Sequence, residues 1–182
     1  MTPACRPASL FLRRLALAAL LLAGGAQAQQ PAPTTYSDVQ QLLKAGKSEQ
    51  ALEQLEQRLA ANGRDPQLHF LRAVALTELE RPDEAIAALV DLTETYPELP
   101  EPYNNLAVLY AARGELDKAR DALEQAVRAR PDYAVAQENL GDIYVRLAAR
   151  AYQRASELPG AARTTAPKLQ AVRQVLAPAA GQ

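Results

Sequence analysis

Apolar residues recur along this chain with one fixed spacing. Three alanines repeat with a period of 34, and each is followed four positions later by a leucine: Ala51, Ala85 and Ala119, with Leu55, Leu89 and Leu123. A fixed period of this length is typical of a solenoid, in which each unit buries its apolar face against its neighbours. We expect Leu106, Tyr110 and Leu123 in the core, and Glu124 and Arg128 on a surface that tolerates substitution.

Within each period, apolar spacing and turn residues predict a pair of helices. The predicted helices cover residues 36–45, 48–61, 66–79, 82–95, 100–113 and 115–130. Gly46 and Gly114 separate the two helices of the first and third pairs. Pro66 and Pro82 stand at first-turn positions, where a proline costs no hydrogen bond within the helix.

The fourth period departs from the pattern. Tyr110 precedes Leu123 by thirteen positions, whereas Tyr144 precedes its counterpart Tyr152 by only eight, so the residues of a turn are missing. Apolar residues continue at helical spacing instead, at Leu140, Ile143, Tyr144, Leu147, Ala148, Ala151, Tyr152, Ala155 and Leu158. We therefore expect one continuous helix over residues 134–158, about 37 Å long at roughly 1.5 Å per residue.

A separate C-terminal segment follows this long helix. Pro159 and Gly160 end the helix, and a linker over residues 159–166 is expected to precede an amphipathic segment, residues 167–178. One face of this segment carries Leu169, Val172, Val175 and Leu176. We expect it to cap the open end of the stack, because a terminal repeat has to hide its apolar edge. The alternatives are that it occupies the groove of the stack or binds another protein.

The repeats resemble the tetratricopeptide repeat, a helix-turn-helix unit. The third unit follows the family's order at Tyr103, Leu106, Ala107, Tyr110, Gly114, Ala119, Leu123, Ala126 and Pro131. Arg72 in the second unit and Asp38 in the first stand where the family usually has an apolar residue. The resemblance covers about residues 35–158 and implies an all-α fold: a right-handed α-solenoid of about three and a half helix-turn-helix repeats, expected over residues 36–158. The fused long helix and the short capping helix would complete it.

The segment 1–28 predicts an export signal. Basic residues precede an apolar run and a small-residue site: Arg6, Arg13 and Arg14, then residues 15–22 and Ala26-Gln27-Ala28. This is the order of a Sec-type signal peptide, here cleaved before Gln29, with a polar linker over residues 29–35. The apolar run is much shorter than the roughly 20 residues of a spanning helix, although an uncleaved anchor is the alternative. The paired arginines also leave twin-arginine export open.

Cysteine and charge narrow the range of functions. Cys5 precedes the apolar run, so a lipidated cysteine after cleavage is not expected, and the mature chain has no thiol chemistry. Residues 29–182 contain 17 Lys and Arg and 21 Asp and Glu, a net charge of −4. This balance does not favour binding to nucleic acid. We expect a periplasmic or secreted protein of a Gram-negative bacterium, with no stable membrane anchor after cleavage.

No group of residues suggests catalysis. His69 is the only histidine, and a lone histidine beside Phe70 on a helix is ordinarily structural or exposed to solvent. The chain has no second metal-ligating partner for it, no phosphate-binding glycine loop and no nucleophile motif. We therefore expect a protein that is not an enzyme and that needs neither a cofactor nor a metal.

Two asparagines are the candidates for a binding site. Asn105 and Asn139 lie one period of 34 apart, so they project alike from the first helices of consecutive repeats. The resemblance implies that first helices line the concave surface and that asparagine there binds the backbone of an extended peptide, since an amide both donates and accepts. Residues expected to flank this groove are Asn104, Glu101, Val108, Glu138, Asp142 and Arg146. The alternative is that both asparagines hold neighbouring repeats together.

The expected groove is acidic apart from Arg146. A basic clamp for a terminal carboxylate is therefore not predicted, and a neutral to basic segment is the expected ligand. The sequence predicts a non-catalytic protein-protein interaction scaffold, adaptor or assembly factor of the bacterial periplasm or cell envelope. The alternative is a permanently associated subunit of a cell-wall or secretion complex, whose repeats pack on one partner.

Overall fold

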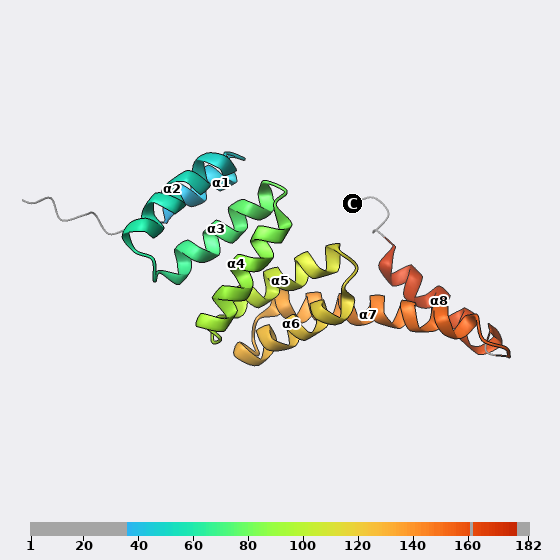
Figure 1. Ribbon diagram of the computed structural model, residues 1–182. Coiled ribbons are helices and arrows are strands. Elements are labelled where there is room, and N and C mark those ends of the chain that lie inside the picture. Colours follow the sequence, from blue (N-terminus) through green and yellow to red (C-terminus); the bar gives the residue numbers. More distant parts are fainter. Residues whose placement is uncertain (1–35, 161, 178–182) are drawn as a thin grey trace, which may run out of the picture. The chain divides into compact units, whose positions relative to one another are not determined.

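A computed structural model describes residues 36–160 and 162–177, and this part of the chain is a succession of helices (Figure 1). They are α1 (Ser37–Lys44), α2 (Ser48–Ala61), α3 (Pro66–Glu78), α4 (Pro82–Thr95), α5 (Pro100–Ala112), α6 (Leu116–Ala129), α7 (Ala134–Ser156) and α8 (Ala162–Leu176). The first six begin and end within one residue of their predicted bounds, which confirms the three helix pairs. The predicted signal peptide and the linker over residues 29–35 lie outside the described residues.

The residues that carry the period form the core. Ala51, Ala85 and Ala119 are each 0% exposed, and the leucines four positions later are at most 1% exposed. Each helix packs against the next along the chain, with further contacts between α1 and α3 and between α5 and α7. The alanines let the helices approach closely, and the leucines fill the space beside them. Leu106 and Leu123 are buried as predicted, whereas Tyr110 is only half-buried.

The backbone repeats with the same period as the side chains. The turn between the two helices of each pair contains one residue with a positive φ: Gly46 at 69°, Glu80 at 56° and Gly114 at 75°. These three positions are separated by the same period as the alanines. A left-handed conformation suits glycine, because a Cβ atom there meets the neighbouring carbonyl. Glu80 is therefore the strained member of the series.

The helix α7 confirms the predicted fusion. It runs without a turn from Ala134 to Ser156, 23 residues, and ends two residues before the predicted bound. Ala148, one period after Gly114, lies inside it and is helical. The chain therefore does not reverse where a regular fourth repeat would turn, and the outer half of α7 continues past the stack (Figure 1).

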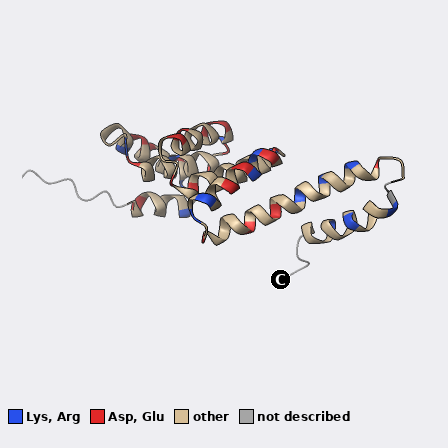
Figure 2. Ribbon diagram, turned by 90° about the horizontal axis from the view of Figure 1, so that it is seen from below, with Lys and Arg blue, Asp and Glu red and all other residues tan. Residues whose placement is uncertain are grey.

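The C-terminal helix differs from its prediction. α8 begins at Ala162, not at Pro167, so the expected linker over residues 159–166 is shortened to the turn that follows α7. Pro167 lies inside α8 and removes one hydrogen bond of its first turns. Packing against α7 offsets this loss, since α8 runs back along α7 and buries Leu169 to 8% exposure (Figures 1 and 2). Val175 stays 67% exposed, so the predicted apolar face is only partly covered.

The second helices of consecutive repeats, α4 and α6, differ in the polarity of one face. Ile86 and Val90 of α4 are half-buried and pack against the core. The residues one period later in α6 are Arg120 and Glu124, and Arg120 pairs with acidic residues of its own helix. A charged face replaces an apolar one where the next second helix would pack. A terminal repeat needs such a face to stay soluble.

Two side chains of α7 bind this polar end. The hydroxyl of Tyr144 donates to a carboxylate oxygen of Glu124 at 2.9 Å. Nη2 of Arg150 donates to Oδ2 of Asp117 at 2.7 Å. The bond from Arg150 lowers the pKa of Asp117, and the bond to Glu124 raises the pKa of Tyr144. Glu124, predicted to be a tolerant surface position, is therefore engaged in holding α7 against α6.

The two residues that depart from the family pattern are both paired. The guanidinium of Arg58 donates to Asp38 and lowers the pKa of that carboxyl. Val39, the next residue, is 0% exposed and supplies the buried side chain of that turn. Nε of Arg72 lies 3.9 Å from a carboxylate oxygen of Glu56 on the preceding helix. Charge pairing between neighbouring helices thus accommodates polar residues at apolar positions.

Truncating the repeated leucine should destabilise the whole stack. Leu123 is 1% exposed, so Leu123→Ala should lower the free energy of unfolding by about 2–5 kcal/mol in urea titrations followed by circular dichroism. Arg128→Ala, an exposed position on the same helix, should change it by less than about 0.5 kcal/mol. Equal effects of the two substitutions would contradict the assignment of the inner face of α6.

Relieving the strained turn should stabilise the protein. Glu80→Gly should raise the free energy of unfolding by up to about 1 kcal/mol, because glycine adopts the left-handed conformation without a steric cost. Gly114→Ala should lower it by about 1–2 kcal/mol. A Cβ at Gly114 meets no atom within 4 Å, so this loss would reflect the backbone alone. Thermal melts that move both variants in the same direction would refute the shared turn conformation.

Candidate functional site

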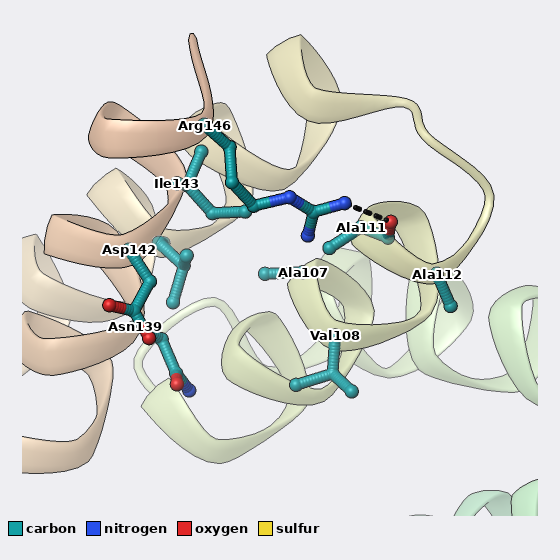
Figure 3. A pocket seen from close by; sticks show the side chains of 9 residues that line it. Ala107, Val108, Ala111, Ala112, Asn139, Asp142, Ile143 and Arg146 are labelled. Atoms are coloured by element: carbon teal, nitrogen blue, oxygen red, sulfur yellow. Dashed lines mark hydrogen bonds between the residues drawn. The ribbon is translucent and has the colours of Figure 1, made fainter. Parts of the chain in front are cut away.

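A pocket lies between α5 and α7, the first helices of consecutive repeats (Figure 3). Its volume is about 400 Å³. The residues that line it are Ala107, Val108, Ala111 and Ala112 of α5, Leu123 of α6, and Asn139, Asp142, Ile143 and Arg146 of α7. Three of the four lining residues on α5 are alanines, whose small side chains fill little of the space between the helices.

The bottom of the pocket is apolar and its rim is polar. Ile143 and Leu123 are 4% and 1% exposed, and they belong to the core beneath the pocket. Val108 is 52% exposed at one side of the opening, opposite Asn139 and Asp142 (Figure 3). This arrangement suits a ligand that buries a short aliphatic side chain and keeps its polar atoms at the rim.

Asn139 connects the two helices as well as lining the pocket. Its Nδ2 donates to Oδ1 of Asn104 at 2.8 Å, and Asn104 is 6% exposed. The bond occupies one N–H of Asn139 and leaves this side chain a second N–H and its carbonyl oxygen. Asn105, the predicted counterpart of Asn139, is half-buried and does not line the pocket. The asparagine pair between these repeats is thus formed by Asn104 and Asn139.

Arg146 spans the pocket toward the end of α5. Its Nη2 donates to the backbone carbonyl of Ala111 at 3.1 Å (Figure 3). The carbonyls at a helix C-terminus carry partial negative charge, so a guanidinium is stabilised there. Asp142 lies one turn earlier on α7 and is exposed, which adds a carboxylate to the rim.

The structure brings together four of the eight predicted groove residues in this pocket: Val108, Asn139, Asp142 and Arg146. Asn104 joins them through its hydrogen bond to Asn139. Asn105, Glu101 and Glu138 are not part of the lining. Glu101 accepts a hydrogen bond from Nη2 of Arg130 at 2.7 Å, and Glu138 is exposed on α7.

Sequence reasoning missed the small and buried residues that shape the pocket. Ala107 and Ala111 lie one turn apart on α5, with Ala112 beside them. This run of small side chains on one helix was the available signal. A pocket forms where side chains are too small to fill the space between helices, so patterns of charge and hydrogen bonding in the sequence do not predict it.

Other candidate chemistry is structural where the structure describes it. Nε2 of His69 lies 2.8 Å from the backbone carbonyl of Gly63, which ties α3 to the preceding turn. Over residues 36–160 and 162–177, no three His, Cys, Asp or Glu side chains gather in a way that could hold a metal ion. In the same part of the chain, no helix combines the length and the apolar character needed to cross a bilayer.

Structural comparison gives low sequence identities and a shared fold. The type III secretion chaperone SycD of Yersinia enterocolitica, solved with a peptide of the translocator YopD, is 17% identical; the match covers 61% of this chain and 90% of that one, with a TM-score of 0.56. The first tetratricopeptide domain of human RPAP3 is 20% identical, with 63% and 91% coverage and a TM-score of 0.59. Its second such domain, solved with an HSP70 peptide, is 21% identical, with 59% and 90% coverage and a TM-score of 0.54.

Sequence comparison identifies the repeat family. No curated protein sequence matches this chain. Two family models described as tetratricopeptide repeat match residues 39–100 and 76–143, and together they cover more than half of the chain. The matched residues include all the alanines and leucines of the period and the three positive-φ turns. The chain belongs to the tetratricopeptide repeat proteins.

Proposed function

We propose that this protein is a non-catalytic interaction scaffold, adaptor or assembly factor that binds a peptide segment in the groove between α5 and α7. The pocket of about 400 Å³ with an apolar bottom and a polar rim is the observation that carries this proposal. Tetratricopeptide proteins are typically interaction scaffolds, and two of the similar structures contain a bound peptide, which supports the same assignment.

The rim favours a neutral to basic segment. Asp142 is an exposed carboxylate at the rim, and Glu138 is exposed on the same helix outside the lining, whereas the guanidinium of Arg146 is bonded to a backbone carbonyl. A segment that inserts an aliphatic side chain beside Val108 would bring its backbone within reach of Asn139. A lysine or arginine next to that side chain would meet Asp142. The polar rim is more compatible with a segment that binds reversibly than with a permanently associated subunit.

We also propose that the protein acts after export, in the periplasm or cell envelope. The sequence order of basic residues, apolar run and small-residue site supports this, and the site predicts cleavage before Gln29. N-terminal sequencing of the protein from a soluble periplasmic fraction should begin at Gln29. A chain recovered in the membrane fraction and still containing Arg13 would refute the cleaved, soluble form.

A substitution at Val108 distinguishes an effect on ligand binding from an effect on stability better than a substitution at Asn139. Removing the side chain of Asn139 would leave the buried Asn104 without its partner, so stability and binding would change together. Val108 is 52% exposed, so Val108→Lys adds a charged chain at the opening without removing core contacts. Val175→Lys is the matched control, because Val175 is 67% exposed and lies on α8, outside the pocket.

Peptides selected from a random library on the wild-type protein provide the ligands. They should carry an aliphatic residue next to Lys or Arg, and Val108→Lys should weaken their binding by about tenfold or more, equivalent to about 1.4 kcal/mol. Fluorescence anisotropy measures both variants against the same peptide. Val175→Lys should bind like the wild type. Equal affinity of all three proteins, with unchanged thermal melts, would exclude the pocket as the binding site.

A further inference from the structure

Charge is divided unevenly between the repeats and the hairpin formed by the outer half of α7 and α8. Residues 36–146 contain 20 Asp and Glu and 12 Lys and Arg, a net charge of −8. Residues 147–177 contain five Lys and Arg and one Glu, a net charge of +4. In Figure 2 the ribbon segments of Lys and Arg lie along this hairpin, whereas those of Asp and Glu are frequent on the other helices. One molecule therefore carries two surfaces of opposite charge.

The end of the hairpin combines an exposed apolar residue with exposed cations. Leu158 follows α7 and is 62% exposed. Arg154 and Arg163 lie on either side of it in the sequence; both are exposed, and neither forms an ion pair within the described residues, although Arg150, Arg120 and the charge of Arg154 together lower the pKa of Asp117. Arg150, by contrast, is bonded to Asp117. We call Arg154, Leu158 and Arg163 the hairpin tip.

One opposing charge lies beside the hairpin tip, and it is partly engaged. Glu157 accepts a hydrogen bond from Nε2 of Gln153 at 3.3 Å, one turn back on α7. Lys168 lies over the ring of Tyr152, and Arg173 donates to Gln153, so the remaining cations of α8 flank its contact with α7. The net charge near the turn remains positive.

A pocket with complementary character lies on α2. Its volume is about 320 Å³, and its lining is Glu49, Leu52, Glu53, Glu56, Leu79 and Arg81. Leu52 is 7% exposed and Leu79 is half-buried, which gives the pocket an apolar bottom. Glu49 and Glu53 are exposed and have no ion-pair partner within the described residues. We call this the acidic socket.

The one cation of the socket is neutralised locally. Nε and Nη2 of Arg81 donate to the two carboxylate oxygens of Glu84 at 2.7 and 2.6 Å. The socket therefore presents an apolar bottom with a negative rim, whereas the hairpin tip presents an apolar side chain with positive neighbours. The two surfaces are therefore complementary in charge, and each combines an apolar part with charged neighbours.

We propose that the hairpin tip of one molecule docks into the acidic socket of a second copy. Leu158 would enter the apolar bottom, and Arg154 and Arg163 would meet the carboxylates of the rim. The tip and the socket of one molecule lie on helices far apart in the packing order, because α3, α4, α5 and α6 come between α2 and α7. We therefore place the contact between two molecules. It joins two different surfaces, so each associated pair keeps a free tip and a free socket and can extend into a chain or a ring.

Salt dependence is the first signature of this contact. The contact is small and partly ionic, so it is expected to be weak and screened by salt. Sedimentation velocity of the purified protein should show mass that increases with concentration at about 20 mM salt and monomer at about 500 mM salt, because the screening length falls severalfold. A monomer under both conditions would overturn the proposal.

Charge reversal tests the partners directly. Arg154→Glu with Arg163→Glu, and separately Glu49→Lys with Glu53→Lys, should each remain monomeric at low salt, because tip and socket then carry the same sign. An equal mixture of the two variants should associate again, since each supplies the charge that the other needs. The control Arg64→Glu with Arg128→Glu makes the same change in net charge as the tip variant, at exposed positions elsewhere, and should associate like the wild type.

Further variants distinguish this contact from other causes of association. Leu158→Ser should weaken association about threefold or more while leaving its salt dependence, because the apolar part of the contact is lost. Association that persists in either double variant, or that the Arg64 and Arg128 control also abolishes, would overturn the proposal. So would a wild-type protein that stays monomeric but binds vesicles of anionic phospholipid through Arg154 and Arg163, because the tip would then serve a membrane surface.

Discussion

The close approach of helices at Ala51, Ala85 and Ala119 is the contact on which the rest of the structure depends. Short helices in water are marginal alone, and α1 has only eight residues, so each helix is stable through its neighbours. The buried leucine beside each alanine supplies the apolar area of these contacts. The stack ends after the third pair of helices. The apolar face formed by Ile86 and Val90 is replaced by a charged face one period later, and a charged face does not need a further second helix to cover it.

The continuous helix α7 gives the end of the stack two distinct surfaces. Its inner half packs on α5 and α6 and contributes Asn139, Asp142 and Arg146 to the pocket. Its outer half leaves the stack and, together with α8, forms a basic hairpin. The second surface depends on the missing turn, because a reversal at Ala148 would have placed a second helix against the exposed Tyr144. The shorter spacing in the fourth period thus changes which surfaces the terminal repeat exposes.

The repeats were predictable because their signals are local and recur. The alanine and leucine spacing, the turn glycines and the uninterrupted apolar stripe of α7 each depend on neighbouring residues.

The features that the sequence did not predict depend on packing between helices. Pro167 is a poor residue for a helix interior, but α8 as a whole packs against α7, so the helix start was predicted too late. Asn104 and Asn105 point about 100° apart around one helix, and the sequence does not say which of them meets Asn139. Glu124 is polar but engaged, since Tyr144 reaches it from a different helix.

Hydrogen–deuterium exchange with a library-selected peptide tests the central claim, binding in the groove between α5 and α7, most directly. Bound peptide should slow exchange of backbone amides in residues 105–112 and 139–146, because local opening of α5 and α7 would have to release the ligand. Amides of α2 should keep their rates, since that helix is far along the packing order from the pocket. Protection confined to α2 or α8, or no change at saturating peptide, would contradict the account.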